Sequence, residues 1–288
     1  MAARGCPGLA ADWLNGWLAA VGATVLVPQM RLAWSPHLLP HAVLDVPGDD
    51  DPADHLAALL PSIVDLESWP IARQLDGHAE LQWNVEVATF RDRAAFARHS
   101  TAPWTLSAIY TDLSWDREKR AHVIGRGQFA TPMPGRVNTI GDRLRKLIPA
   151  AREVDLRASL EGRGARVANN GLGFDVGRVG SLADETEMLV DPVIELLAFY
   201  ALALFPVRGD GRSDARQRGW TGRRGEPGTF RWPTWTDALD AMAIDALLDC
   251  TGPAAQWLGV TGWWQVVPFD RRGQSDVTRA YGSMRSAP

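Results

Sequence analysis

The sequence predicts an α+β protein, in which a mixed, largely antiparallel sheet packs with several helices. Three observations lead to this fold class. Helix-like and strand-like patterns of apolar residues are mixed without the regular strand–helix–strand order of a doubly wound sheet. Apolar residues make up 46% of the 288 residues, which is enough for a substantial core. The charged fraction is 22%, and this composition excludes bulk disorder and a coiled coil.

The N-terminal segment predicts a helix, a buried strand and further short elements. Residues 12–27 begin as a helix in which Trp13 and Trp17 share one face, and the β-branched run after Gly22 predicts a buried strand. The acidic sequence PGDDDP, at residues 47–52, is interpreted as a solvated turn. The other expected elements are strands at 31–34 and 42–46 and a helix at 54–64.

The middle of the chain predicts strands, a basic helix and a glycine-rich loop. A helix is expected at 136–148, with basic residues on its polar side, and a glycine-rich loop at 161–180. Apolar and polar residues suggest strands at 82–90, 105–113, 122–129 and 154–160. A soft boundary at 149–161 would divide the chain into an N-terminal α+β region (1–150) and a C-terminal region (151–288), unless the two form one domain.

An apolar helix followed by a cationic loop organises the C-terminal part. Asp191 is the expected N-cap of this helix, Pro192 suits its first position and Glu195 lies in its first turn. Pro206 ends the helix, and the arginine- and glycine-rich loop extends over 207–229. A buried helix that leads into a cationic loop indicates an anion-binding site.

A tryptophan-rich segment continues the chain after this loop. It is expected to enter a second helix, with Thr236 as the N-cap. A β segment at 257–269 and a polar, arginine-bearing tail from Arg271 are expected to close the chain.

Charge and cysteine content restrict the class of protein. The net charge of −4 argues against a simple nucleic-acid coat protein, but acids concentrate at 45–67 and bases at 117–146, which predicts one acidic and one basic face. No apolar run approaches the ~18–20 residues that span a bilayer, so no membrane partner is expected. Cys6 and Cys250 cannot form a disulfide scaffold, and we expect a protein of the reducing cytoplasm.

Motifs of common enzymes are missing from the sequence. There is no HExxH, CxxC, GxSxG or GxxxxGK[ST] motif, and the glycines at 171–177 miss the dinucleotide-binding spacing by one residue. We therefore expect a protein that is not an enzyme and needs no metal or cofactor. The enzyme alternative is a metal-dependent nuclease or other hydrolase that uses Asp49, Asp50, Asp51 or Asp175.

Clusters of arginine beside tryptophan are the pattern with functional content. Cations that bind phosphates and aromatic rings that stack on bases are what single-stranded nucleic acid requires. Trp220, Trp232, Trp263 and Trp264 lie near arginines, although the ordinary role of a tryptophan is to fill the core. The candidate nucleic-acid-binding residues are Arg136, Arg143, Arg145, Lys146, Arg208, Arg212, Arg216, Arg218, Arg223, Arg224 and Arg231.

Three segments resemble a known family in their order along the chain. They are GLAADWLNGWLAAVGATVL near the N-terminus, GLGFDVG followed by DPVIELLAFYALALFP, and FRWPTWTDALDAMAIDALL. Together they cover about a third of the chain and are similar to subtype I-U (also called I-G) CRISPR-associated proteins, a Cascade large-subunit-like family. The chain is short for a full large subunit.

The resemblance implies a non-catalytic subunit of a type I CRISPR surveillance (Cascade) complex in antiviral defence. Its partners would be crRNA, target DNA and other Cascade subunits, with sequence read by base pairing and the nucleic-acid backbone contacted by the protein. A purely protein-assembly scaffold, in which the tryptophans form an interface, is the second alternative.

Overall fold

The computed structural model describes residues 3–63, 87–88, 91, 110–115, 124–126, 129, 147–168, 171, 189–209, 215–221, 229–250, 253–271 and 278–286. Helices and antiparallel strands are interspersed along these ranges, which confirms the α+β class. Within the described residues, no helix has the length and apolarity needed to cross a membrane.

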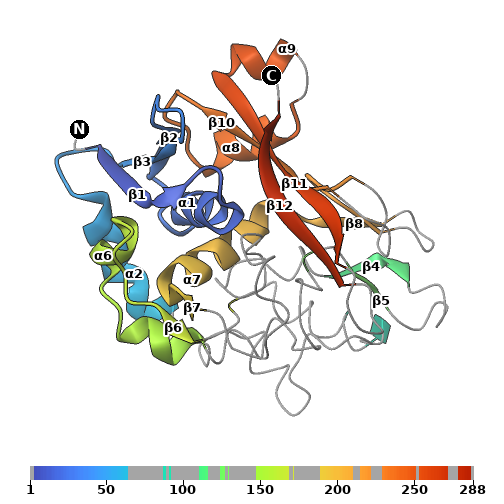
Figure 1. The fold of residues 1–288 in the computed structure, drawn as a ribbon, viewed down its shortest axis with the longest axis horizontal. Helices are drawn as coiled ribbons and strands as arrows, with labels where there is room; N and C mark the ends of the chain where they lie inside the picture. Colours follow the sequence, from blue (N-terminus) through green and yellow to red (C-terminus); the bar gives the residue numbers. More distant parts are fainter. Residues whose placement is uncertain are drawn as a thin grey trace.

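The N-terminal elements form a three-stranded antiparallel sheet beside two helices (Figure 1). The sheet order is β1-β3-β2, and the short strands expected at 31–34 and 42–46 are confirmed. The expected second helix is also confirmed, although it begins earlier than predicted. The elements are β1 (Arg4–Ala10), α1 (Leu14–Leu26), β2 (Arg31–Trp34), β3 (His41–Asp45) and α2 (Pro52–Ile63).

Helix α1 corrects the prediction of a helix followed by a strand. Residues after Gly22 stay helical as far as Leu26, and Val27 is the C-cap. The β-branched residues Val21 and Thr24 are fully buried, and the Thr24 hydroxyl donates a 2.7 Å hydrogen bond to the Val21 carbonyl. Burial of this helix in the core therefore outweighs the weak strand preference of its side chains.

Helix α7 (Pro192–Ala201) confirms the predicted apolar helix and its cap. The Asp191 carboxylate accepts hydrogen bonds from the backbone N–H groups of Val193 (3.0 Å) and Ile194 (3.3 Å). A 3-10 turn, η6 (Leu202–Leu204), prolongs the helix to the region of Pro206. Every residue of α7 is buried, as its sequence, apolar except for Glu195, predicts.

Helices α1 and α7 cross at the centre of the molecule (Figure 1). Gly22 makes this close crossing possible, since a Cβ at that position would clash with the Leu197 carbonyl oxygen. The hydrophobic core that surrounds the crossing contains residues from both the N-terminal and C-terminal parts of the chain.

The C-terminal elements differ from the prediction at two points. The tryptophan-rich segment is a strand, and the following helix is capped by Asp240, which accepts a 2.8 Å bond from Ala243 N–H, so Thr236 is not the cap. The expected polar tail includes a strand that pairs with the confirmed β segment before it. The elements are β10 (Arg231–Trp235), α8 (Ala241–Leu248), α9 (Pro253–Trp257), β11 (Val260–Arg271) and β12 (Thr278–Ser286), with sheet order β10-β11-β12.

Three two-stranded antiparallel ribbons complete the described strands. The ribbon β8–β9 replaces part of the predicted cationic loop. Strand β4 overlaps the end of the strand predicted at 105–113 and extends two residues beyond it, and β5 lies within the strand predicted at 122–129. The ribbons are β4 (Tyr110–Trp115) with β5 (Ile124–Arg126), β6 (Val167–Ala168) with β7 (Leu189–Val190), and β8 (Val207–Gly209) with β9 (Ala215–Gln217).

Two other predicted strands are wrong where the structure describes them. The segment expected as a strand at 154–160 contains α6 (Leu156–Leu160), because the Asp155 carboxylate caps it by accepting a 2.9 Å bond from Arg157 N–H. Val87 and Ala88 are helical, and the rest of the strand expected at 82–90 lies outside the described residues. Most of the basic helix expected at 136–148 also lies outside them.

Three tryptophans connect the two parts of the core through their indole N–H groups. Trp17 donates to the Pro233 carbonyl (2.9 Å), Trp232 to the Ala11 carbonyl (2.8 Å) and Trp235 to the Leu32 carbonyl (2.8 Å). All three side chains are fully buried. Each ring thus fills the core while its one polar atom is satisfied by backbone from a distant segment.

Candidate functional site

Arg208 and Arg216 lie directly opposite each other on the β8–β9 ribbon. The side chains of directly paired residues in an antiparallel ribbon project to the same side, so the guanidinium groups of Arg208 and Arg216 lie on one face of the ribbon. Both residues are exposed, and Arg208 approaches Asp249 at 3.8 Å. Two like charges at paired positions are unfavourable by themselves, and this placement favours an anionic partner.

Gln217 fixes the position of this ribbon from its other side. The side-chain amide donates a 2.9 Å bond to the Phe205 carbonyl, and its oxygen accepts a 3.1 Å bond from Phe129 N–H. Gln217 is 5% exposed and pairs with Val207, which is also buried. The ribbon therefore has a buried face anchored to the core and a second face that carries Arg208 and Arg216.

Arg218 has a different environment from its neighbours on the same segment. Its side chain is 9% exposed, donates to the Leu204 carbonyl (2.8 Å) and pairs with Asp245 and with Asp249, the latter at 2.7 Å. This arginine ties the end of η6 to α8. Of the predicted nucleic-acid-binding residues that the structure describes, it has the strongest structural role.

Arg231 and Trp263 form a stacked pair on the outer face of the C-terminal sheet. The Arg231 guanidinium carbon lies 4.5 Å from the centre of the Trp263 ring. Neighbouring Trp232 and Trp264 are paired across the same two strands and point to the buried face, with 0% and 6% exposure. Because side chains alternate along a strand, Arg231 and Trp263 share the opposite face.

The described tryptophans divide into core residues and surface residues. Trp232 is enclosed and cannot stack on a base, so of the two roles considered for it the ordinary one, filling the core, is confirmed; Trp264 is almost as deeply buried. Trp220 is partly buried among Phe129 and Phe230. Trp263 is the member of the predicted set that is half-buried on an outer sheet face.

The remaining predicted cations lie outside the described residues. They are Arg136, Arg143, Arg145, Lys146, Arg212, Arg223 and Arg224. Arg212 lies in the sequence between the paired residues Gly209 and Ala215. The residues that flank the segment with Arg223 and Arg224 are joined by a 2.8 Å bond from Thr221 N–H to the Thr229 carbonyl, two positions before Arg231.

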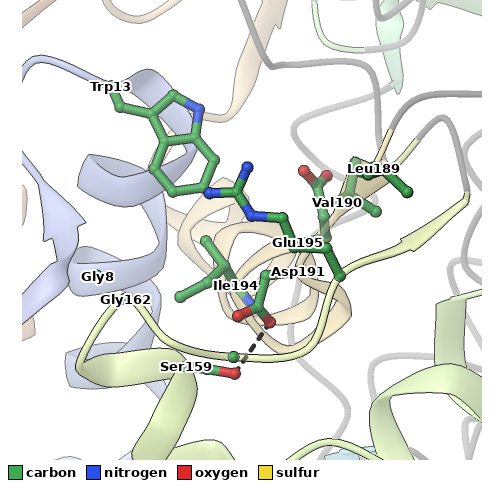
Figure 2. A pocket seen from close by; sticks show the side chains of 11 residues that line it. Gly8, Trp13, Ser159, Gly162, Leu189, Val190, Asp191, Ile194 and Glu195 are labelled. Atoms are coloured by element: carbon green, nitrogen blue, oxygen red, sulfur yellow. Dashed lines mark hydrogen bonds between the residues drawn. The ribbon is translucent and has the colours of Figure 1, made fainter.

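A cavity of about 140 Å³ lies at the other end of α7 (Figure 2). Its lining comes from the end of β1, the start of α1, α6, the β6–β7 ribbon and the first turn of α7. Asp191, Glu195 and Ser159 supply polar groups, and Trp13 and Ile194 supply apolar surface. The Ser159 hydroxyl donates a 3.0 Å hydrogen bond to Asp191.

Glu195 is buried at this cavity although it belongs to the most apolar helix. It is 1% exposed and accepts a 2.5 Å bond from the Asn15 side-chain amide of α1. The Asn15 side-chain oxygen is also buried and has no hydrogen-bond partner among the residues that the structure describes. The sequence placed Glu195 only in the first turn of α7. The available signal was a polar side chain near the start of each of the two apolar helices, Asn15 in α1 and Glu195 in α7.

The pKa of Asp191 reflects its position in the cavity wall. Burial raises the pKa above its ordinary value of 3.8, and this outweighs the hydrogen bonds from Ser159, Ile194 and Val193 and the charge of Arg166, which lower it. A carboxyl group with a raised pKa retains its proton more readily. Burial at this cavity therefore makes the ionised form of Asp191 less favourable than it would be in water.

The acidic turn proposed for the enzyme alternative contains an ion-pair network. Asp51 pairs with Arg4 (2.6 Å) and Arg157 (2.5 Å), and it accepts a 2.9 Å bond from Ala53 N–H at the start of α2. Asp50 lies 3.4 Å from His55. Asp51 thus joins β1, α2 and α6. Within the described part of the chain, no group of three or more His, Cys, Asp or Glu residues is arranged to hold a metal ion.

Comparisons with known proteins do not assign this chain to a family. No protein-family model matches the chain, and no curated protein sequence matches it significantly.

Proposed function

We propose that the protein is a non-catalytic nucleic-acid-binding subunit. The observation that supports this proposal best is the placement of Arg208 and Arg216 side by side on the exposed face of a ribbon whose other face is anchored in the core. Phosphate groups along a nucleic-acid strand match such a pair of guanidinium groups in charge and in hydrogen-bond geometry.

Arg231 and Trp263 extend the proposed surface from phosphates to bases. Arg231 N–H donates a 3.0 Å bond to the Gly219 carbonyl, which places this pair next to the strand segment that carries Arg216. An aromatic ring beside cations is the combination by which proteins hold single strands without reading sequence. We call Arg208, Arg216, Arg231 and Trp263 the arginine surface.

The resemblance to Cascade large-subunit-like proteins suggests the biological setting of this surface. In that setting the protein acts in the cytoplasm, and its partners are crRNA, target DNA and other Cascade subunits. Base pairing between guide and target reads the sequence in such complexes, so a subunit that contacts backbone needs neither a catalytic residue nor a cofactor.

The test is the salt dependence of single-strand binding, measured by fluorescence anisotropy with labelled RNA and DNA. Each lost phosphate contact lowers the slope of log K against log salt by about 0.7 for single strands. The double variant Arg208→Ala/Arg216→Ala is expected to bind about tenfold or more weakly at low salt and to show a slope smaller by about 1.4.

The control is Arg31→Ala, which removes an exposed arginine from β2 in the N-terminal sheet. It is expected to leave affinity and slope close to those of the wild type. Absence of salt-dependent binding by the wild-type protein, alone and together with the products of its neighbouring genes, would refute the proposal.

Trp257 supports the scaffold alternative as a second candidate function. This side chain is 87% exposed at the end of α9, next to Leu258, which is 42% exposed. Large exposed apolar residues of this kind are common in protein interfaces. A complex that survives nuclease treatment and the arginine substitutions, but is lost in Trp257→Ser, would favour the scaffold over nucleic-acid binding.

A further inference from the structure

The cavity at the start of α7 has a solvent-facing rim and a polar floor. Arg166 and Leu189 are exposed and form the rim, whereas Ser159, Ile194 and Glu195 are buried below it. Figure 2 shows the Trp13 ring on one side of the cavity, with Asp191 and Ser159 on the other side of Ile194. The cavity is thus a small open site with an aromatic side.

Its carboxylates are held in place by the surrounding backbone. One oxygen of Asp191 accepts from Ser159, Val193 and Ile194, and the other lies against Gly164, where a Cβ would clash with it. Glu195 is oriented by Asn15. These side chains are positioned by hydrogen bonds before any ligand arrives, and such preorganisation lowers the cost of binding.

The size and charge of the cavity restrict its ligand. Its volume of about 140 Å³ is close to the ~150 Å³ of a cavity that accommodates one benzene molecule, so the fit is to a single six-membered ring. Two carboxylates against one arginine in the lining favour a ligand with hydrogen-bond donors. The Trp13 side chain offers a surface on which a planar ring can stack.

Cytosine combines these properties among the common nucleobases. It is a single six-membered ring, and its exocyclic amino group donates hydrogen bonds that Asp and Glu accept. Uracil has the same size, but where cytosine has the amino group uracil has a carbonyl oxygen. This oxygen would repel a carboxylate. Adenine and guanine also have amino groups, but their fused rings exceed the single six-membered ring that the cavity volume matches.

We propose that this cavity binds one cytosine base that has left the stack of its neighbours in the strand. The base is held between the Trp13 ring and the carboxyl groups of Asp191 and Glu195. The proposal rests on the proposed nucleic-acid function and adds a base-specific subsite to the arginine surface. Helix α7, which is about 15 Å long at 1.5 Å per residue, and the turn η6 lie in the chain between the cavity and the start of the arginine surface at Arg208.

The direct test uses nucleosides and saturation-transfer NMR on the intact protein, and it is independent of the arginine surface. Cytidine is expected to give transfer from the protein to its ring protons, and uridine a signal at least about tenfold weaker at equal concentration. Equal signals from cytidine and uridine, or none from cytidine, would overturn the proposal. Binding of arginine methyl ester in place of cytidine would also overturn it and would indicate a site for a partner's cationic side chain.

Two substitutions test the carboxyl groups while preserving local structure. Glu195→Gln keeps the size of the side chain and an oxygen that can accept from Asn15, and Asp191→Asn keeps a good N-cap residue. Both variants are expected to lose the preference for cytidine over uridine. Asp50→Asn, which neutralises an exposed acid far along the chain from the cavity lining, is the matched control and should retain it. A preference that survives both cavity substitutions would contradict the assignment.

Oligonucleotide binding separates this proposal from the proposed function. The wild type is expected to bind oligo-dC more tightly than oligo-dU, Glu195→Gln to bind both equally, and Arg208→Ala/Arg216→Ala to bind both more weakly while the preference remains. Strong salt-dependent binding without any preference would refute the cytosine site alone. Absence of binding to either oligonucleotide would refute the nucleic-acid function, and the nucleoside experiment would then decide on the cavity by itself.

Discussion

The two ends of helix α7 carry opposite charge and have opposite solvent access. At its start, Asp191 and Glu195 face a small cavity, where Glu195 is buried and Asp191 is partly buried. Beyond its end, the Leu204 carbonyl accepts a hydrogen bond from Arg218, and the exposed Arg208 and Arg216 follow on the β8–β9 ribbon. One buried helix thus connects an acidic cavity with a cationic surface.

The helix dipole accounts for part of this difference. Carboxylates are favoured at the positive N-terminal end of a helix and cations near the negative C-terminal end. Asp191 as cap and Arg218 as the donor to Leu204 follow this rule, so both have a structural role whatever else they do. Glu195, in the first turn of α7, is also favoured by the dipole, but its burial against Asn15 is not explained by it, and neither are the exposed Arg208 and Arg216.

The largest expected effect comes from the helix crossing that holds both ends in place. Gly22→Ala would drive a methyl group into the Leu197 carbonyl at the centre of α7 and force α1 and α7 apart. We expect a loss of about 3 kcal/mol in the free energy of unfolding, at the upper end for an overpacked core. Chemical denaturation measures this loss, and Gly22→Ser should cost at least as much. An unchanged denaturation midpoint would show that the helices can separate freely.

The second-largest expected effect distinguishes Arg218, which has a structural role, from Arg208, which lies on the surface. Arg218→Met removes the donor to the Leu204 carbonyl and the cation that pairs with Asp245 and Asp249, and we expect a loss of about 2 kcal/mol. Arg208→Met, at a side chain that is 66% exposed, should change stability by less than about 0.5 kcal/mol. Thermal unfolding of the two variants measures the contrast. Equal losses would mean that Arg208 is also a structural residue.

The smallest expected effect is a pH dependence of opposite sign at two aspartates. Burial raises the pKa of Asp191, so its contribution to stability is complete below 3.8 and is lost as pH rises through the folded-state value. Burial also raises the pKa of Asp51, but the bond from Ala53 and the charges of Arg157 and Arg4 outweigh it and lower the pKa below 3.8. The contribution of Asp51 is therefore present above 3.8 and is lost as pH falls through the folded-state value.

Urea denaturation over a pH series tests both signs. Relative to Asp191→Asn, the wild type should lose stability as pH rises above 3.8. Relative to Asp51→Asn, it should lose stability as pH falls below that value. The same sign in both variants would contradict the assigned causes of the two pKa shifts.

Local patterns in the sequence predicted the elements whose own residues decide their structure. The Asp191–Pro192 start of α7, the strands at 31–34 and 42–46 and the strand that contains Trp263 were predicted because capping and alternation act between near neighbours. The error after Gly22 has a tertiary cause, since the strand expected there is a helix against which α7 packs. Tertiary packing also decides that the Trp232 ring fills the core.

The candidate site was predicted only in part, for the same reason. The sequence alone determined the α+β class, the capped apolar helix and the supply of arginine and tryptophan. The tertiary structure decided which arginine is enclosed by aspartates and which pair stands exposed on a ribbon. It also decided that Asn15 and Glu195, 180 positions apart, meet beside a cavity. Exposure and contact between distant residues depend on how elements pack, and no local pattern of residues contains that information.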